Sequence, residues 1–139
     1  MKVKDAMHKG TSYVEPSTAV WDIARQMRDN DIGAMPMWAD GKVVGMVTDR
    51  DITCRAMADG VDRGNLTARD VMTLNVVSCS PEDDIAVAIK AMEAKKVRRL
   101  PVTDSQHRLV GMLSLGDVSH QISQKISGEV LRAVSAHHA

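Results

Sequence analysis

The sequence predicts an α/β (α+β) protein made of two units with the same element order, β-α-β-β-α. Three observations lead to this prediction. The chain of 139 residues repeats itself once. Each copy contains an apolar stripe at helical spacing, and each then contains two short apolar segments separated by a turn. One copy alone is too small to bury much core, so we expect the two copies to pack against each other.

The first halves of the two copies align at one spacing. Their second halves align at a spacing that is one residue longer. Pro36 meets Pro101 at the first spacing, and Asp51 meets Asp117 at the second. One inserted residue near His107 absorbs the difference, and such an insertion belongs in a turn. The motifs are therefore placed at residues 1–60 and 68–127, with a linker at 61–67 and a C-terminal tail at 128–139.

Each copy is expected to begin with a short helical turn and a brief strand. The turns are expected at 3–7 and 68–72, and the strands near 12–14 and 76–79. An amphipathic helix follows, because apolar residues recur at i, i+4 and i+7. These residues are Val20, Ala24 and Met27 in the first copy and Ile85, Ile89 and Met92 in the second. Ser80 and Pro81 have the pattern of a helix start for the second copy.

Two strands and a second helix are expected to complete each copy. The strands "AMPMW" and "KVVGMVT" flank Asp40-Gly41, a strong signal for a hairpin turn. The strands "RLPVT" and "RLVGMLS" flank residues 104–107. The second helices are expected from residue 49 to about 59 and from 114 to about 127. The tail beyond Gly128 can extend the last helix to residue 134.

The junction of strand and second helix carries one octet twice, GMVTDRDI at 45–52 and GMLSLGDV at 111–118. Two interpretations fit it. Thr48 with Asp51, like Ser114 with Asp117, has the spacing of a helix cap, which explains these residue types without a ligand. Such a junction also exposes backbone N–H groups that favour anions, and a carboxylate there can accept both hydroxyls of a ribose. The octet alone leaves both interpretations open.

Composition narrows the range of functions. The formal net charge is +0 and the pI about 7.0, which gives no electrostatic reason to bind nucleic acid or a membrane. No apolar run approaches the ~20 residues of a membrane span, and no signal peptide is evident, so a cytoplasmic location is expected. No P-loop and no catalytic arrangement around the five histidines is present, so no enzyme is predicted. Cys54 and Cys79 are interpreted as buried small hydrophobes.

The tandem units, each with an apolar-Pro-apolar strand and a G-x-x-[ST]-x-x-D octet, resemble a CBS-domain pair, or Bateman module, over residues 3–127. The resemblance implies that the two motifs pack through their three-stranded sheets with pseudo-twofold symmetry. It also implies a cleft between them for adenosine-type ligands such as AMP, ATP or S-adenosylmethionine. No cofactor is required in such a module.

The resemblance also assigns site residues. It implies Thr48 and Asp51 in one site, Ser114 and Asp117 in the other, and Val14 and Val77 beside the base. Arg98 and Arg99 precede Pro101, where relatives place a basic residue that reaches phosphate. Their counterparts, Gly33 and Ala34, cannot do so. We therefore expect the Asp117 site to prefer a phosphorylated ligand, and the Asp51 site to be empty or to take a less charged one. A cationic helix end is the alternative explanation for the basic run.

The function expected is a regulatory, ligand-sensing module without catalysis, similar to the small stress-associated CBS-pair proteins of bacteria. The alternative is a ligand-free structural or protein-interaction module. A third hypothesis is a metal or redox response through the histidines, such as His137 and His138, or through the two cysteines. A homodimer is expected through apolar residues of the second helix, namely Ile52, Ala56 and Met57. The sequence identifies no protein target.

Overall fold

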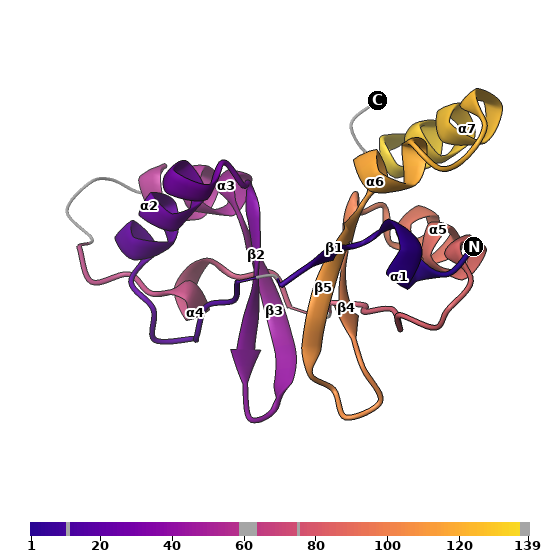
Figure 1. Cartoon of the computed structure of the whole chain (residues 1–139). Coiled ribbons are helices and arrows are strands. Elements are labelled where there is room, and N and C mark those ends of the chain that lie inside the picture. The colour runs from indigo at the N-terminus through magenta and orange to yellow at the C-terminus, as the bar shows by residue number, and fades with distance from the viewer. Residues whose placement is uncertain (11, 59–63, 75, 137–139) are drawn as a thin grey trace. The chain divides into compact units, whose positions relative to one another are not determined.

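Two units, each mixing helices with antiparallel strands, make up the chain (Figure 1). The computed structural model describes residues 1–10, 12–58, 64–74 and 76–136. One unit is continuous, Ser12–Val76, and the other joins Met1–Thr11 to Val77–Ala139. The predicted class, α/β of the α+β kind with two tandem motifs, is confirmed. Residues 61–63 of the predicted linker and 137–139 of the predicted tail lie outside the described residues.

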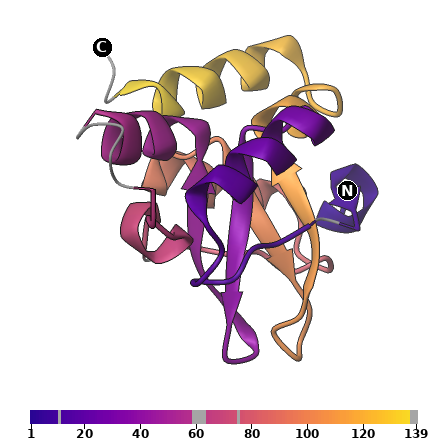
Figure 2. The ribbon, with the colours of Figure 1, turned by 90° about the vertical axis from the view of Figure 1, so that its left-hand side faces the viewer.

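The continuous unit is built on a hairpin of β2 (Ala34–Ala39) and β3 (Lys42–Thr48), drawn in magenta in Figure 2. Asp40 and Gly41 join the strands with φ values of 53° and 77°. Positive φ at both positions defines a two-residue type I′ turn, which Asp-Gly favours. The hairpin predicted from this dipeptide is confirmed.

Short helices and extended segments surround this hairpin. Helix α2 (Val20–Asn30) buries its apolar stripe against the strands. Helix α3 (Asp49–Asp51) continues directly into a π-helix, η1 (Ile52–Met57), and α4 (Ala68–Val71) lies near the end of the unit. Arg55 of η1 donates from Nη1 to the carbonyl oxygens of residues 71 and 72 at 3.2 and 2.7 Å, which ties η1 to the end of α4. Asp59, the expected helix end, lies outside the described residues.

The second unit contains a three-stranded antiparallel sheet of order β1-β5-β4. The strands are β1 (His8–Lys9), β4 (Arg99–Thr103) and β5 (Leu109–Ser114). His107, the inserted residue, lies in the β4–β5 loop with a φ of 64°, so the insertion falls in a turn as predicted. Short β1 was not predicted, because two residues carry no readable alternation of apolar and polar side chains.

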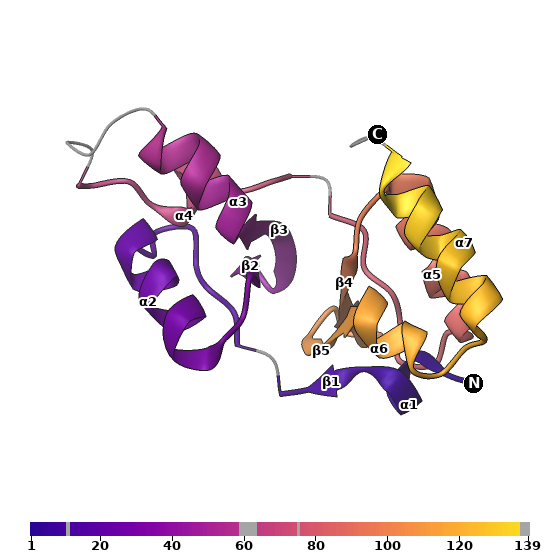
Figure 3. The ribbon, with the colours of Figure 1, turned by 90° about the horizontal axis from the view of Figure 1, so that it is seen from above.

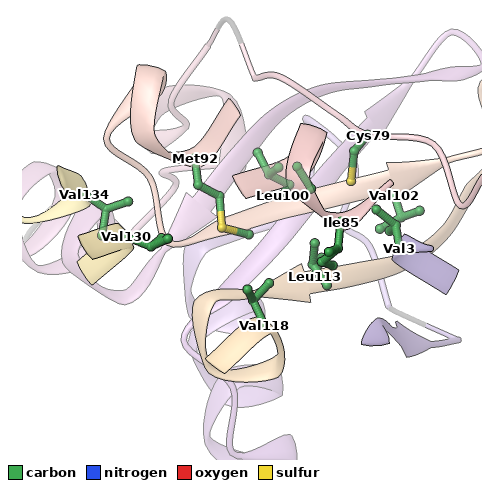
Figure 4. Close-up of a cluster of buried hydrophobic side chains, with 11 residues drawn as sticks. Val3, Cys79, Ile85, Met92, Leu100, Val102, Leu113, Val118, Val130 and Val134 are labelled. Atoms are coloured by element: carbon green, nitrogen blue, oxygen red, sulfur yellow. The ribbon is translucent and has the colours of Figure 1, made fainter. Parts of the chain in front are cut away.

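Within the described residues, four helices belong to this unit. They are α1 (Val3–Ala6), α5 (Ile85–Lys95), α6 (Leu115–Ser119) and α7 (Gln124–Val134). Helix α7 lies along α5 (Figure 3). The core shared by these elements, drawn in Figure 4, is formed by Val3, Ile85, Met92, Leu100, Leu113, Val118 and Val130, among others.

Two helix boundaries differ from the prediction. A single helix from 114 to about 127 was wrong: α6 ends at Ser119, and Ser123 starts α7 by accepting a hydrogen bond from the Ile126 N–H at 3.3 Å. Serine side chains that bond nearby backbone groups compete with helix continuation. Helix α5 begins after Ser80 and Pro81, at a cap formed by Asp84, because residues 80–83 close a turn of their own.

The leading segment of each sequence repeat lies in the unit of the other repeat. Residues 1–11 belong with 77–139, and the segment that carries α4 belongs with the first hairpin. The isolated bridges show the same pattern inside each unit, since Thr73 pairs with Met46 in one and Lys2 with Asp84 in the other. The motif boundaries at 1–60 and 68–127 thus remain predictions of where each motif runs along the sequence, and the folded units combine parts of both.

Among the described residues, none of the helices is both long enough and apolar enough to cross a bilayer.

Candidate ligand-binding site

Both octets close a capping box at the start of the following helix. Thr48 Oγ1 accepts a hydrogen bond from the Asp51 N–H at 3.1 Å, and Asp51 Oδ2 accepts one from the Thr48 N–H at 2.9 Å. In the other unit, Ser114 Oγ accepts from the Asp117 N–H at 3.1 Å, and Asp117 Oδ2 accepts from the Ser114 N–H at 2.8 Å. The cap interpretation therefore holds in both copies, and these bonds use one oxygen of each carboxylate.

The second carboxylate oxygen of each octet faces a group from another segment. Asp117 Oδ1 lies 2.8 Å from His8 Nε2. Asp51 Oδ1 lies 3.3 Å from Thr73 Oγ1 and 3.9 Å from Arg55 Nε. His8 and Thr73 are equivalent positions of the repeat, related by the same spacing as Pro36 and Pro101. Each acid thus has one oxygen held by its own helix start and one that contacts a group from outside that helix.

Glycine opens the octet because a second segment crosses directly over it. A Cβ at Gly111 would collide with the carbonyl oxygen of His8, and a Cβ at Gly45 would lie 2.9 Å from the carbonyl oxygen of Thr73. Real Cβ atoms do not approach backbone this closely, so any larger residue would push the segment away. The glycine therefore admits the segment that brings His8 or Thr73 to the acid.

A cavity of about 520 Å³ opens beside the second octet. Its walls come from the start of β4, from the junction of β5 and α6, and from α7. The lining includes Arg98, Arg99, Ser114, Gly116, Ser127 and Leu131. The buried Ser127 Oγ has no hydrogen-bond partner among the residues that the structure describes. The cavity therefore has two guanidinium groups that can donate to an anionic ligand, whereas the Ser114 hydroxyl already donates its proton to Asp117 Oδ2.

Backbone and side-chain contacts hold Arg98 between the octet and α7. The Leu115 N–H donates to the Arg98 carbonyl oxygen at 2.7 Å, which joins the start of β4 to the start of α6. Arg98 Nη2 donates to Ser135 Oγ at 3.2 Å, just beyond the end of α7. Arg99, the next residue, is exposed. The structure thus places both arginines beside Ser114, although one of them already has a partner on the C-terminal segment.

At the first octet, an acidic residue, Asp49, lies beside the positions that correspond to the two arginines. Gly33 and Ala34 stand where the other unit has its two arginines. Asp49, the counterpart of Leu115, donates its N–H to the Gly33 carbonyl oxygen at 2.9 Å, and its Oδ2 lies 3.0 Å from the position of a Cβ on Gly33. A carboxylate in this position repels a phosphate, so the two octets differ in the ligand charge that they can accept.

Of the predicted site residues at the second octet, Arg98, Arg99 and Ser114 line the cavity, whereas Asp117, Val14 and Val77 do not. Val14 is 2% exposed and lies in the core of the first unit; its N–H donates to the Pro36 carbonyl oxygen and its own carbonyl accepts from the Trp38 N–H. Val77 is partly buried and packs against the core of the second unit. Their predicted place beside a base stays a prediction.

Sequence reasoning missed His8, Thr73 and the wall that α7 contributes. The repeat contained a signal for the first two, since each directly follows the matching triplets 5–7 and 70–72. No such signal existed for Ser127 and Leu131, because their placement depends on the helix break after α6.

Histidine and cysteine side chains are the candidates for metal or thiol chemistry. Within residues 1–10, 12–58, 64–74 and 76–136, no group of three His, Cys, Asp or Glu side chains gathers to hold a metal ion. His137 and His138 lie outside the described residues. Cys79 is buried as predicted, and burial raises the pKa of its thiol to about 11. The prediction for Cys54 was wrong: it is exposed, because η1 turns Ala56 rather than Cys54 toward the core.

Comparison with known proteins identifies the family. A model of the CBS domain matches residues 3–56 and 68–124, so the chain belongs to the CBS domain family and carries two copies of its motif. The CBS domain-containing protein YhcV of Bacillus subtilis is 36% identical over 134 residues, which cover 96% of this chain and 94% of YhcV. Hypoxic response protein 1 of Mycobacterium tuberculosis is 31% identical over 132 residues, covering 94% of this chain and 92% of that protein.

Solved structures agree with this assignment. Hypoxic Response Protein I, crystallised with two coordinated zinc ions, matches with a TM-score of 0.78 at 31% identity, covering 88% of this chain and 100% of that one. CBSX2, solved in complex with AMP, matches with a TM-score of 0.76 at 25% identity, covering 86% of this chain and 94% of that one. The predicted family, a CBS-domain pair, is confirmed.

Proposed function

We propose that this protein is a regulatory module that binds an adenosine-type ligand and acts without catalysis. The observation that carries the proposal is the cavity at the second octet, where Arg98 and Arg99 stand beside Ser114. Its volume of about 520 Å³ lies within the usual range for small-molecule sites, about 300–1,000 Å³. The complex of the relative CBSX2 with AMP supports this ligand class. No cofactor is required for such a role.

The chemistry of the second octet favours a phosphate-bearing ligand, AMP or ATP, over S-adenosylmethionine. Arg98 and Arg99 can donate to phosphate oxygens, and charge-assisted bonds of this kind are the stronger ones. Ser114 supplies a hydroxyl at the same wall of the cavity. Asp117 would accept the ribose hydroxyls through its carboxylate. Thr48 and Asp51 form the equivalent pair of the first octet, where Asp49 disfavours phosphate and a less charged ligand or none is proposed.

Calorimetric titration with AMP tests the arginines. We expect Arg99→Ala to weaken AMP binding by about tenfold or more, because a hydrogen bond to a charged group contributes roughly 1.5–3 kcal/mol. Arg25→Ala is the matched control, since Arg25 is an exposed arginine on α2 that pairs only with Asp22 among its described neighbours. Equal affinity of Arg99→Ala and wild type would contradict the phosphate role.

A second pair of variants assigns the octets. We expect Asp117→Ala to abolish AMP binding and Asp51→Ala to leave it nearly unchanged, because Arg98 and Arg99 line the cavity at the second octet, whereas Gly33 and Ala34 stand in their place at the first. Both variants lose a helix cap worth about 0.5–2 kcal/mol, so each controls for the loss of stability in the other. Loss of AMP binding in Asp51→Ala alone would reverse the assignment.

The alternative function, a ligand-free structural or protein-interaction module, is favoured by the complete capping boxes, which account for both octets without a ligand. Thermal unfolding with AMP, ATP and S-adenosylmethionine separates the two functions. A ligand at 100 times its dissociation constant should stabilise the protein by about 2.7 kcal/mol. No rise in the unfolding temperature with any of the three compounds would favour the interaction module.

Assembly and cellular role are part of the same proposal. We propose a cytoplasmic homodimer with a role in a stress response, supported by the likeness to hypoxic response protein 1. Of the apolar residues expected at the dimer interface, Ala56 is buried in its own unit, whereas Met57 is 45% exposed and Ile52 partly exposed. Native mass spectrometry of freshly purified protein would report the number of chains and any retained nucleotide together.

A further inference from the structure

We infer that His8 gates the Asp117 half of the proposed site, an inference that rests on the proposed function. His8 Nε2 lies 2.8 Å from Asp117 Oδ1, and the two side chains are 78% and 12% exposed. The contact thus pairs a solvent-facing imidazole with a carboxylate that is almost wholly covered. The imidazole thus restricts the approach of a ligand to Asp117 Oδ1.

The contact occupies the oxygen of Asp117 that its own helix start does not use. Asp117 Oδ2 accepts hydrogen bonds from the N–H and from the hydroxyl of Ser114, both at 2.8 Å. Two neighbouring ribose hydroxyls donate to a carboxylate through its two oxygens, and Oδ2 already has two donors. Oδ1 is therefore the oxygen with acceptor capacity left for a ribose hydroxyl, and the His8 imidazole already takes part of that capacity.

The backbone of His8 is fixed, while its side chain can turn. Strand β1 pairs with β5 at His8 and Met112. The segment before it is anchored by Val3, which is wholly buried and whose N–H donates to the Asp83 carbonyl oxygen at 2.9 Å. Because the imidazole is mostly exposed, it can rotate into solvent without breaking the strand pairing. The gate opens by rotation of one side chain, and β1 stays docked.

The first octet lacks an equivalent gate. Thr73 stands at the position of His8, and its Oγ1 lies 3.3 and 3.4 Å from the two oxygens of Asp51. The threonine side chain is short and its hydroxyl lies farther from the acid than the His8 imidazole, which is 2.8 Å from Asp117 Oδ1. Gating is therefore a property of the octet that also has the arginine-lined cavity.

Calorimetry with AMP on four proteins measures the competition. The proteins are wild type, His8→Ala, His8→Gln and Thr73→Ala. We expect His8→Ala to bind AMP about twofold to fivefold tighter, because a partly exposed pair of this kind no longer has to break. His8→Gln keeps a donor that can reach Oδ1, so its affinity should return toward that of wild type. Thr73→Ala, the matched control in the other unit, should bind AMP as wild type does.

The nitrogen-15 resonance of His8 Nε2 reports the contact with Asp117 directly. The first measurement is made on the free protein, without a ligand. Replacing Asp117 by Asn should shift the Nε2 resonance of His8 in the free protein, because the carboxylate acceptor is lost. AMP should shift the same resonance in wild type, because the ribose takes the acceptor from the imidazole. Circular dichroism on each variant confirms that the fold is retained.

The outcomes separate the gate from the proposed function. If AMP binds wild type but binds His8→Ala no more tightly, or leaves the His8 resonance in place, the gate is overturned and the proposed function stands. Weaker binding by His8→Ala would make His8 a ligand contact and would also overturn the gate. If AMP binds neither wild type nor His8→Ala, the proposed function fails, and the gate fails with it.

Discussion

Asp51 and Asp117 each divide two tasks between two oxygens. One oxygen closes the capping box of the helix, and the other meets a side chain from a crossing segment. The choice between helix cap and ligand contact, which the octet leaves open, is therefore not exclusive. A carboxylate with two oxygens and about four acceptor positions can serve both purposes. Removing either acid disturbs helix and site together, so variants of His8 and Arg99 report on the site more cleanly.

The two thiols provide a test at the same scale. Burial raises the pKa of Cys79 to about 11, so its thiolate is nearly absent at neutral pH, whereas Cys54 is exposed. We expect a thiol reagent to modify Cys54 alone in the native protein and both cysteines after denaturation. Peptide mass mapping of the modified protein checks this. Rapid native modification of Cys79 would show that its site opens readily to solvent.

Among the elements, the crossing segments show why the octet begins with glycine. β1 lies over Gly111, and the segment at Thr73 lies over Gly45. Contact with the crossing segment therefore explains the glycine of the octet without any ligand. The glycine leaves room for the crossing segment, and the hydroxyl caps the helix. The acid contacts a side chain of the crossing segment, His8 or Thr73.

Alanine at two glycines should change stability in opposite directions. Gly111→Ala should destabilise the protein by about 1–3 kcal/mol, because the new Cβ would collide with the His8 backbone. Gly128→Ala should stabilise it by about 0.5–1 kcal/mol, because Gly128 lies within α7 and a Cβ there meets no atom within 4 Å. Urea unfolding of both variants measures the difference. Equal stabilities would contradict the close crossing at Gly111.

Elements with a local cause could be predicted from the sequence, and those with a tertiary cause could not. Asp40-Gly41 sets its own hairpin turn, and α2 is indicated by its periodic apolar stripe. The break between α6 and α7 was not predicted, because it depends on Val130 and Val134 reaching the core from a second helix. For the site, Ser114, Asp117 and both arginines were identified through the motif and the family resemblance. His8 was missed, since nothing near it in the sequence indicates which acid it will meet.

At the scale of the whole molecule, sequence repeats and folded units do not coincide. Residues 1–11 fold with 77–139, and residues 12–76 form a unit by themselves. Helix α4, which opens the second repeat, supplies Ala68 and Val71, both 0% exposed, to the core of the first. A fragment cut at the repeat boundary therefore loses buried side chains that a fragment cut at the unit boundary keeps.

Two fragments of similar length test this. We expect residues 12–76 to unfold cooperatively on heating, although a domain of this size is only marginally stable. We expect residues 1–60 to lack a cooperative transition, because they omit α4 and retain α1 and β1 without the sheet to which these belong. Calorimetry and circular dichroism on both fragments provide the measurement. A more stable 1–60 fragment would show that the repeat folds on its own leading segment.

The exchange of leading segments also limits how such a chain could have arisen. A lone ancestral copy with this arrangement would have had a sheet edge that the first residues of another copy complete. Such an ancestor would have folded as an intertwined pair of chains. Joining two copies end to end would have made that partnership permanent. The two folded units would then have been free to diverge, so that one now has a histidine and two arginines where the other has a threonine, a glycine and an alanine.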